Sequence, residues 1–197
     1  MISPRLLEHV KNGGIVAYPT STLPGLACLP ETRSLDALFD LKQRSSDKPV
    51  SLGVLSLDQA TELVNVPEKV RRLEAAFAKG GFTFILDAVT TLDARLGGRR
   101  VAVRCLAHPV ARSLVEALGP ITATSANESG EAPAPTAEEA GALLGLPEHA
   151  ILHGVCPGGI GSTILNVVEG KDGVEVTVMR EGIVPRHSVV QWWKNPT

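Results

Sequence analysis

The sequence predicts an α/β fold in which helices flank a twisted, open, mixed β-sheet. Short apolar runs that end at Pro or Gly alternate along the chain with segments whose apolar residues recur at i, i+3 and i+4. Some successive strands follow each other like hairpins, which favours a mixed sheet over a purely parallel one. The 197 residues contain no internal repeat, low-complexity tract or linker, so we predict one domain over residues 1–197.

Helices are predicted where a periodic apolar face lies between a start signal and a stop signal. Near the N-terminus, Leu6, Leu7 and Val10 share a face, and Asn12-Gly13-Gly14 then ends the helix. Later in the chain, Thr136 precedes two glutamates and an apolar run, which is a capping signal. The predicted helices are, in order, residues 4–11, 35–41, 57–64, 67–78, 108–118 and 136–144.

Strands are predicted where a short continuous apolar run lies between turn residues. Ile15 to Tyr18 is such a run, Pro19 ends it, and a Pro- and Gly-rich loop follows as far as Pro30. The predicted strands are, in order, residues 15–18, 50–55, 82–86, 101–104, 121–124, 150–153, 163–168 and 174–179. The C-terminal residues, 184–197, are expected to form a short packed tail.

Composition narrows the class of protein. Hydrophobic residues make up 44% and charged residues 20% of the chain, which is typical of a globular protein, and no apolar run is long enough to span a membrane. Three isolated cysteines, Cys28, Cys105 and Cys156, indicate neither a disulfide framework nor a zinc site, so we expect a reducing, cytoplasmic location. A net charge of −2 argues against a surface built entirely for nucleic acid, although a local basic groove remains compatible with it.

Three cations follow the predicted helix 35–41. Lys42, Arg44 and Lys48 lie at its C-terminal end and in the loop before the next strand. Cations at this place interact favourably with the helix dipole, by about 0.3–1 kcal/mol each. The same residues could also clamp phosphates, because Arg offers a planar fork of donors and Lys a point charge. The residues alone leave both interpretations open.

Three further segments carry small polar or glycine residues at strand ends. Residues 18–26 deliver threonines into a Pro/Gly loop, and residues 122–130 end a strand in consecutive hydroxyl and amide side chains. Residues 158–163 are glycine-rich but lack the lysine of a phosphate-binding P-loop. Each segment alone could equally be an ordinary turn. Among the arginines of residues 95–104, Arg104 is notable because it lies on a predicted strand, and the others are expected on a solvated face.

Taken together, six short motifs resemble those of the YrdC-like family of threonylcarbamoyl-AMP synthases. They are a Tyr-Pro-Thr-x-Thr loop, Lys-x-Arg, a Val-x-Val-Arg strand, Thr-Ser-Ala-Asn-x-Ser-Gly, a Ser-Thr pair and a late Arg-x-Gly. In this chain they lie at residues 18–22, 42–44, 101–104, 124–130, 162–163 and 180–182. The match extends from about residue 10 to residue 183, and the chain length resembles that of the short bacterial form.

The resemblance implies a YrdC-like fold with a positively charged, concave cleft, and it implies a reaction. The amine of L-threonine captures carbon dioxide from bicarbonate, and the carbamate attacks the α-phosphate of ATP with release of pyrophosphate. Fixed cations and Mg²⁺ would stabilise the charge, the metal being held mainly by the ATP phosphates. The adenylate would pass to a tRNA threonylcarbamoyl transferase complex, and contact with tRNA itself is possible.

Residue roles follow from the same resemblance. Catalysis would depend on Lys42, Arg44, Ser125 and Asn127. ATP would also contact Lys48, Thr83 and Arg180. Threonine would be held by Thr22, Arg104, Ser162 and Thr163, and Arg104 would take its carboxylate.

Three positions depart from the family pattern. Pro24 replaces a usual Tyr or Phe, Ser21 replaces a frequent acidic residue, and Gly53 stands where some relatives place a His that contacts threonine. These departures concern the amino-acid side of the site. Two alternatives therefore stay open: a diverged paralogue with another amino-acid or carbamoyl substrate, and a non-catalytic module that binds tRNA or double-stranded RNA.

Overall fold

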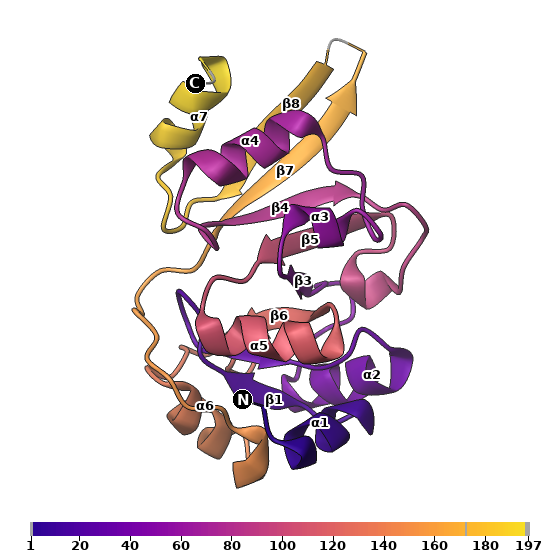
Figure 1. The fold of residues 1–197 in the computed structure, drawn as a ribbon, viewed down its shortest axis with the longest axis vertical. Helices are drawn as coiled ribbons and strands as arrows, with labels where there is room; N and C mark the ends of the chain where they lie inside the picture. The colour runs from indigo at the N-terminus through magenta and orange to yellow at the C-terminus, as the bar shows by residue number, and fades with distance from the viewer. Residues whose placement is uncertain (1, 172, 196–197) are drawn as a thin grey trace.

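The computed structural model describes residues 2–171 and 173–195. Over these ranges eight strands form one sheet, in the spatial order β1-β2-β6-β3-β5-β4-β7-β8 (Figure 1). The pairs β3–β5 and β4–β7 are parallel and the other neighbours are antiparallel, so the predicted mixed sheet is confirmed. The strands are β1 (Val16–Tyr18), β2 (Gly25–Ala27), β3 (Ser51–Val54), β4 (Phe82–Asp87), β5 (Arg100–Cys105), β6 (Ile121–Ser125), β7 (Thr163–Gly170) and β8 (Gly173–Arg180).

Helices flank this sheet, and the helix after Thr136 begins at the cap that the sequence indicates. The Ser3 hydroxyl accepts a hydrogen bond from the Leu6 N–H at 3.2 Å, and the Thr136 hydroxyl accepts one from the Glu139 N–H at 3.1 Å. The helices are α1 (Pro4–Lys11), α2 (Thr32–Leu41), α3 (Leu57–Ala60), α4 (Glu68–Ala76), α5 (Pro109–Leu118), α6 (Ala137–Leu143) and α7 (Arg186–Lys194), with 3₁₀ turns η1 (Ala94–Leu96) and η2 (Glu148–Ala150). The expected packed tail is thus largely the helix α7.

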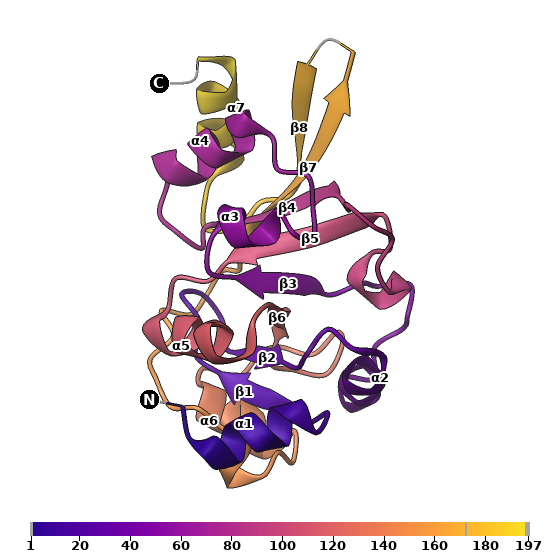
Figure 2. The ribbon, with the colours of Figure 1, turned by 45° about the vertical axis from the view of Figure 1, so that its right-hand side comes forward.

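The two faces of the sheet differ in how far helices cover them. On one face, apolar residues of the strands pack against α2, α3, α4 and α7 in the larger core cluster. On the other face, α1 and α5 cover only the end formed by β1, β2 and β6, where they build a smaller cluster. Figure 2 shows α1 and α5 at the β1 end of the molecule and α4 and α7 toward β7 and β8. Part of the second face therefore lies open.

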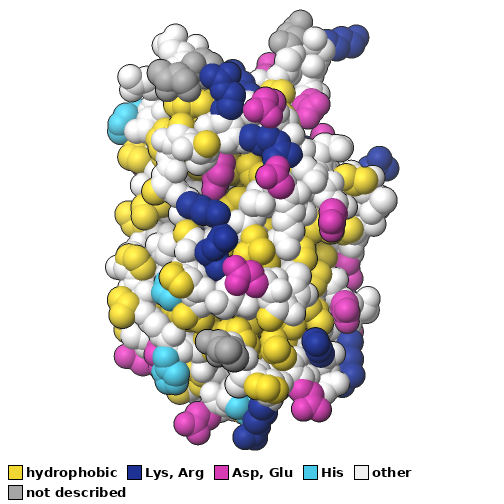
Figure 3. Space-filling model, in the orientation of Figure 1, with side chains coloured by type: hydrophobic (Ala, Val, Ile, Leu, Met, Phe, Trp, Pro, Cys, Tyr) yellow, Lys and Arg dark blue, Asp and Glu magenta, His cyan; other side chains and the backbone are white. Residues whose placement is uncertain are grey.

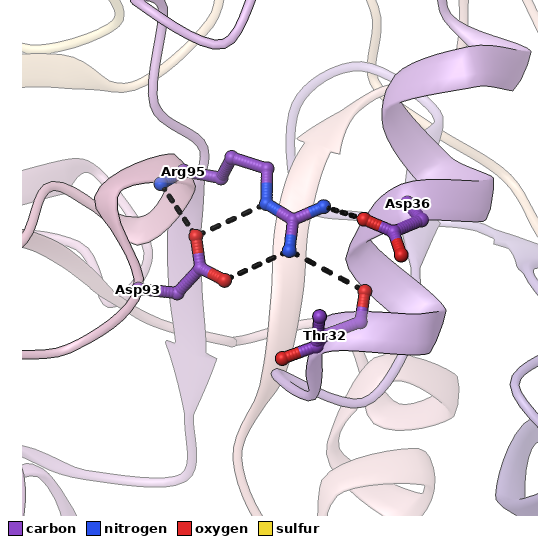
Figure 4. A network of polar contacts seen from close by, with 4 residues as sticks. All are labelled: Thr32, Asp36, Asp93 and Arg95. Atoms are coloured by element: carbon purple, nitrogen blue, oxygen red, sulfur yellow. Dashed lines mark hydrogen bonds and ion pairs between the residues drawn. The ribbon is translucent and has the colours of Figure 1, made fainter.

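An ion-pair network fixes α2 against the rest of the molecule (Figure 4). The Arg95 guanidinium donates to Asp93 at 2.8 and 3.0 Å, to Asp36 on α2, and to the Thr32 carbonyl at 3.4 Å. The Arg95 carbonyl accepts a hydrogen bond of 2.8 Å from the Val50 N–H. Because α2 leads into the loop that carries Arg44, the network holds both ends of that loop. The expectation of a solvated face at Arg95 is therefore wrong.

Three predicted elements differ from the structure. Residues 25–27 form the strand β2 inside the loop that the Pro and Gly residues predicted. The predicted helix 57–64 ends at Ala60, and the predicted strand 150–153 is reduced to a single bridge between Ile151 and Ala17. The other predicted helices and strands are present, with ends shifted by up to a few residues.

Acidic and basic side chains are interspersed on the face seen in Figure 3. Among the described residues, none of the helices combines the length and apolar character that crossing a membrane requires. In the same part of the chain, His, Cys, Asp and Glu side chains form no group of three or more that could hold a metal ion.

Candidate active site

A cleft of about 430 Å³ lies on the open part of the second face of the sheet. Its wall comes from β1 and the loop to β2, the segment between Arg44 and Ser51, the strands β4, β5 and β6, residues 159–164, and the end of β8. Each of the six motifs that the sequence singles out contributes at least one residue to this lining. Segments far apart in the chain therefore meet at one site.

The loop between β1 and β2 is shaped by its own threonines. The Thr20 hydroxyl donates to the Leu23 carbonyl at 2.6 Å and accepts from the Thr22 N–H at 3.0 Å. This local turn buries both side chains and aims the Thr22 hydroxyl at the cleft, where it accepts from Arg104 at 2.9 Å.

Arg104 points into the cleft from the middle of the sheet. Its guanidinium donates to the Gly80 carbonyl at 3.0 and 3.2 Å, and to the hydroxyls of Ser21 and Thr22 at 3.3 and 2.9 Å. No carboxylate forms an ion pair with it among the described residues. A half-buried cation held by neutral groups is suited to bind a carboxylate ligand.

Thr83, Ser162 and Arg180 form a second group in the lining. The hydroxyls of Thr83 and Ser162 are both buried and lie 2.7 Å apart. Arg180 donates to the Ser162 carbonyl at 2.9 Å and lines the cleft from the end of β8. Glu181 follows it and is the one carboxylate in the described lining.

Arg44 and Ser125 line the same cleft, Arg44 from the loop after α2 and Ser125 from the end of β6. Arg44 donates through Nε to the Lys48 carbonyl at 2.6 Å and through Nη2 to the Pro49 carbonyl at 2.9 Å. These two bonds fix the guanidinium at the cleft wall and leave its remaining N–H groups for a ligand. Ser125 reaches the lining at the end of β6.

Lys42 lies two residues from Arg44 but is turned away from the cleft. Its side chain is buried, and Nζ donates to the carbonyls of Ser125 and Asn127 at 2.6 and 2.5 Å. The Lys42 carbonyl accepts a hydrogen bond from the Ser129 N–H at 2.8 Å. Lys42 therefore binds the backbone at both ends of the loop 125–129, which follows β6. Burial, with a smaller contribution from Arg44, lowers the pKa of Lys42 to about 8.

Three other residues to which sequence reasoning assigned ligand contacts also lie outside the cleft lining. Asn127 donates to the carbonyls of Glu128 and Glu131, both at 2.7 Å, and Lys48 is exposed on its loop. The buried Thr163 hydroxyl donates to the Val184 carbonyl at 2.6 Å and accepts from the N–H groups of Gly182 and Val184. Like Lys42, Asn127 and Thr163 hold backbone that surrounds the cleft.

Sequence reasoning overlooked other lining residues. Tyr18 lies in the cleft wall although it was given no ligand contact within the motif at residues 18–22, and burial raises its pKa above the usual range. Ser51 lines the cleft from β3, on the same side of the sheet as Arg104 of the neighbouring β5. The period-2 alternation of β3, with Leu52 in the core, could have identified Ser51.

Gly53, the departure on β3, does not leave an opening for a side chain. A Cβ at this position would lie 2.8 Å from Cδ1 of Leu106. Leu106, buried in the smaller core cluster, thus occupies the space next to Gly53. Pro24, by contrast, lines the cleft.

The chain is similar in sequence to proteins of one family. The sequence model of the Sua5/YciO/YrdC family, described as "Telomere recombination", matches residues 8–182. A "Threonylcarbamoyl-AMP synthase" of Vibrio parahaemolyticus is 33% identical over 162 residues, which cover 78% of this chain and 87% of the relative.

Solved structures show the same fold. P. abyssi Sua5 complexed with L-threonine has a TM-score of 0.80 at 27% identity, over 94% of this chain. The chain spans 55% of that longer protein. E. coli YciO has a TM-score of 0.73 at 25% identity, over 91% of this chain and 88% of its own.

An open mixed sheet with a polar cleft on its uncovered face defines an α/β protein built to hold a small polar ligand. The family match extends over most of the chain. The chain belongs to the Sua5/YciO/YrdC family.

Proposed function

We propose that this chain is an enzyme that makes L-threonylcarbamoyl-AMP from L-threonine, bicarbonate and ATP, with release of pyrophosphate. One observation carries the proposal: three arginines from separate parts of the chain, Arg44, Arg104 and Arg180, line one cleft that holds a single carboxylate among its described residues. Such an excess of fixed cations suits a substrate set that contains a carboxylate and a triphosphate. The names of the relatives point to the same product.

The amino-acid end of the cleft is assigned to Arg104. Its guanidinium would pair with the threonine carboxylate, while Thr22 and the Thr83–Ser162 pair offer hydroxyls within the same hollow. The P. abyssi relative was solved in complex with L-threonine, which supports threonine as the amino acid. Gly53 does not argue for another amino acid, because Leu106 fills the space beside it.

The phosphate end is assigned to Arg44, Ser125 and Arg180. Each lines the cleft with donors that can reach phosphate oxygens. Lys42 and Asn127 would act by shaping the loop that presents Ser125, since their side chains are bonded to its backbone. The exposed Lys48 could reach a phosphate only from the rim.

The donor set suggests where Mg²⁺ would be held. The described lining offers the single carboxylate Glu181, whose Oε2 already accepts from the Arg186 N–H at 2.8 Å. Mg²⁺ prefers several oxygen ligands and retains water, so it would be held mainly by the ATP phosphates. The metal would neutralise charge on the triphosphate, and the arginines would orient it.

The cleft would act chiefly by positioning. The neutral amine of threonine held at Arg104 attacks carbon dioxide derived from bicarbonate, the nitrogen loses a proton to solvent, and a carbamate forms. An oxygen of the carbamate then attacks the α-phosphorus while the bond to the β-phosphate breaks, and the electron pair leaves with pyrophosphate. Arg44 and Arg180 stabilise the charge that develops on the phosphate oxygens.

The product would serve tRNA modification in the cytoplasm. Threonylcarbamoyl-AMP is a reactive mixed anhydride, so a transferase complex acting on tRNA would consume it. A non-catalytic RNA-binding role has less support, because Tyr18 is the one aromatic side chain in the described lining and base stacking needs aromatic surface.

The test is mass-spectrometric detection of threonylcarbamoyl-AMP after incubation with all three substrates. The wild-type chain is expected to form it only when threonine, bicarbonate and ATP are all present. Arg44→Ala should lose most of the pyrophosphate release, whereas the matched rim variant Lys48→Ala should retain most of it. Absence of the product from the wild-type reaction, or full activity of Arg44→Ala, contradicts the proposal.

A further inference from the structure

Glu74 on α4 is a buried carboxylate that the proposed reaction does not use. Neither of its carboxylate oxygens is exposed, and neither makes a regular hydrogen bond among the described residues. The residue lines a second hollow of about 360 Å³, between α3, α4 and the end of β5, together with Lys79 and Cys105. Cys105 points to the opposite face of β5 from Arg104, so this hollow lies behind the cleft.

Gly80 connects the hollow with the cleft. Its N–H lies beside the Glu74 carboxylate, and its carbonyl accepts two hydrogen bonds from Arg104, at 3.0 and 3.2 Å. Its φ of +81° is unfavourable for other residues, and a Cβ would lie 2.7 Å from the Ser21 hydroxyl oxygen. The position therefore requires glycine, and a single residue contacts both the unpaired carboxylate and the guanidinium assigned to threonine.

Glu74 changes its charge near neutral pH. Burial raises its pKa to about 7, and the Gly80 N–H, the Cys105 thiol, Lys79 and Arg104 only partly oppose this effect. The other charged groups that line the hollow are Arg71 and Asp58, which form an ion pair with each other. Lys79 and Arg104 are therefore the cations that act on the Glu74 carboxylate as it titrates.

We propose that Glu74 is a positioning residue for the amino-acid end of the cleft, and that its charge sets how strongly Arg104 binds the carboxylate of threonine. The inference rests on the proposed function, in which Arg104 holds that carboxylate. When Glu74 is ionised, its negative charge offsets the field of Arg104 and weakens the attraction for a second carboxylate. When Glu74 is protonated, the guanidinium acts on threonine with its full charge. Glu74 does not touch the substrate.

The test compares threonine binding by calorimetry at about pH 6 and about pH 8.5, on either side of the pKa of Glu74. In the wild-type chain, the affinity is expected to fall by about fivefold as pH rises. Glu74→Gln keeps the shape and removes the titration, so its affinity should be the same at both pH values. Glu68→Gln, an exposed carboxylate of the same helix, is the matched control and should retain the fall.

A second measurement uses the wild-type chain alone. Because coupling between two sites is reciprocal, saturating threonine must raise the pKa of Glu74, as followed by ¹³C NMR of the glutamate side chains. An unchanged pKa in the presence of threonine overturns the inference, as does an equal fall in affinity for Glu74→Gln. Absence of threonine binding to the wild-type chain at either pH contradicts the proposed function, and the inference with it.

Discussion

The two faces of the sheet use the same strands for different purposes. Along β5, Val101, Val103 and Cys105 point into the core beneath the helices, whereas Arg104 points into the open cleft. In β4, Phe82 and Phe84 are core residues, and Thr83 between them lines the cleft. Because side chains alternate along a strand, each buried residue fixes the direction of its polar neighbour. Packing on the covered face of the sheet therefore fixes the directions of the side chains that line the cleft on the open face.

A few polar residues do not follow this division. Thr163 and Lys42 are buried away from the cleft, and each bonds to backbone segments that border it. Their role is to hold the cleft wall, so changes there should affect stability before they affect binding. We therefore expect a loss of activity from a change in the cleft lining, a loss of stability from a change at Thr163, and a changed pH dependence of stability from a change at Lys42.

The largest expected effect is on the open face. Arg104→Met keeps an unbranched stem and removes the charged guanidinium, so kcat/KM for threonine should fall by about 100-fold or more, because a charge-assisted contact made in the cleft is lost. Steady-state pyrophosphate release measures this effect. The matched control is Arg99→Met, an exposed arginine just before the same strand, which should keep its activity. Equal losses of activity in Arg104→Met and Arg99→Met would contradict the assignment of the open face to ligand binding.

The fold could be predicted where local signals were strong. The α1 and α6 helices begin at capped positions, and the strands β4 and β5 contain the apolar runs 84–86 and 101–103. The strand β2 was not predicted because it has three residues, lies in a loop rich in Pro and Gly, and pairs on one side with β6, which is distant in sequence. The apolar run at 150–153 predicted a strand, but Ala150 ends the 3₁₀ turn η2 and Ile151 forms a single bridge to Ala17.

The site could be predicted only in part, for a related reason. A motif identifies which residues occur together but not which way each side chain points. In the pair Ser162–Thr163, alternation at the start of β7 sends Ser162 to the cleft and Thr163 to the core. No such period applies to Lys42 and Arg44 at the end of α2, where the loop hydrogen bonds decide their directions.

A smaller effect is expected at Thr163. Thr163→Val keeps the shape and removes the hydroxyl, which leaves the Val184 carbonyl and the N–H groups of Gly182 and Val184 without this partner. The free energy of unfolding should fall by about 2 kcal/mol. Urea denaturation checks the value, with Thr177→Val on the exposed side of β8 as the control, for which little change is expected. An unchanged unfolding midpoint for Thr163→Val would show that this hydroxyl does not hold the cleft wall.

The smallest effect is a pH dependence that belongs to Lys42. Its pKa is about 8 in the folded chain and about 10.4 in an unfolded chain. Between these values the unfolded chain binds more protons, so the contribution of Lys42 to stability rises with pH over this window. In Lys42→Met this contribution is absent. The difference in unfolding free energy between wild type and Lys42→Met should therefore grow in favour of wild type by on the order of 1 kcal/mol from about pH 8 to about pH 10.

Chemical denaturation at several pH values measures this difference, because other titrating groups cancel between wild type and variant. Lys48→Met is the matched control, since its side chain is exposed on the same loop, and its curve should run parallel to that of wild type. Parallel curves for Lys42→Met as well would mean that Lys42 stays solvated and free to reach the cleft. Lys42 would then be available as a phosphate ligand, and the distinction between residues that line the cleft and residues that hold its wall would fail at this position.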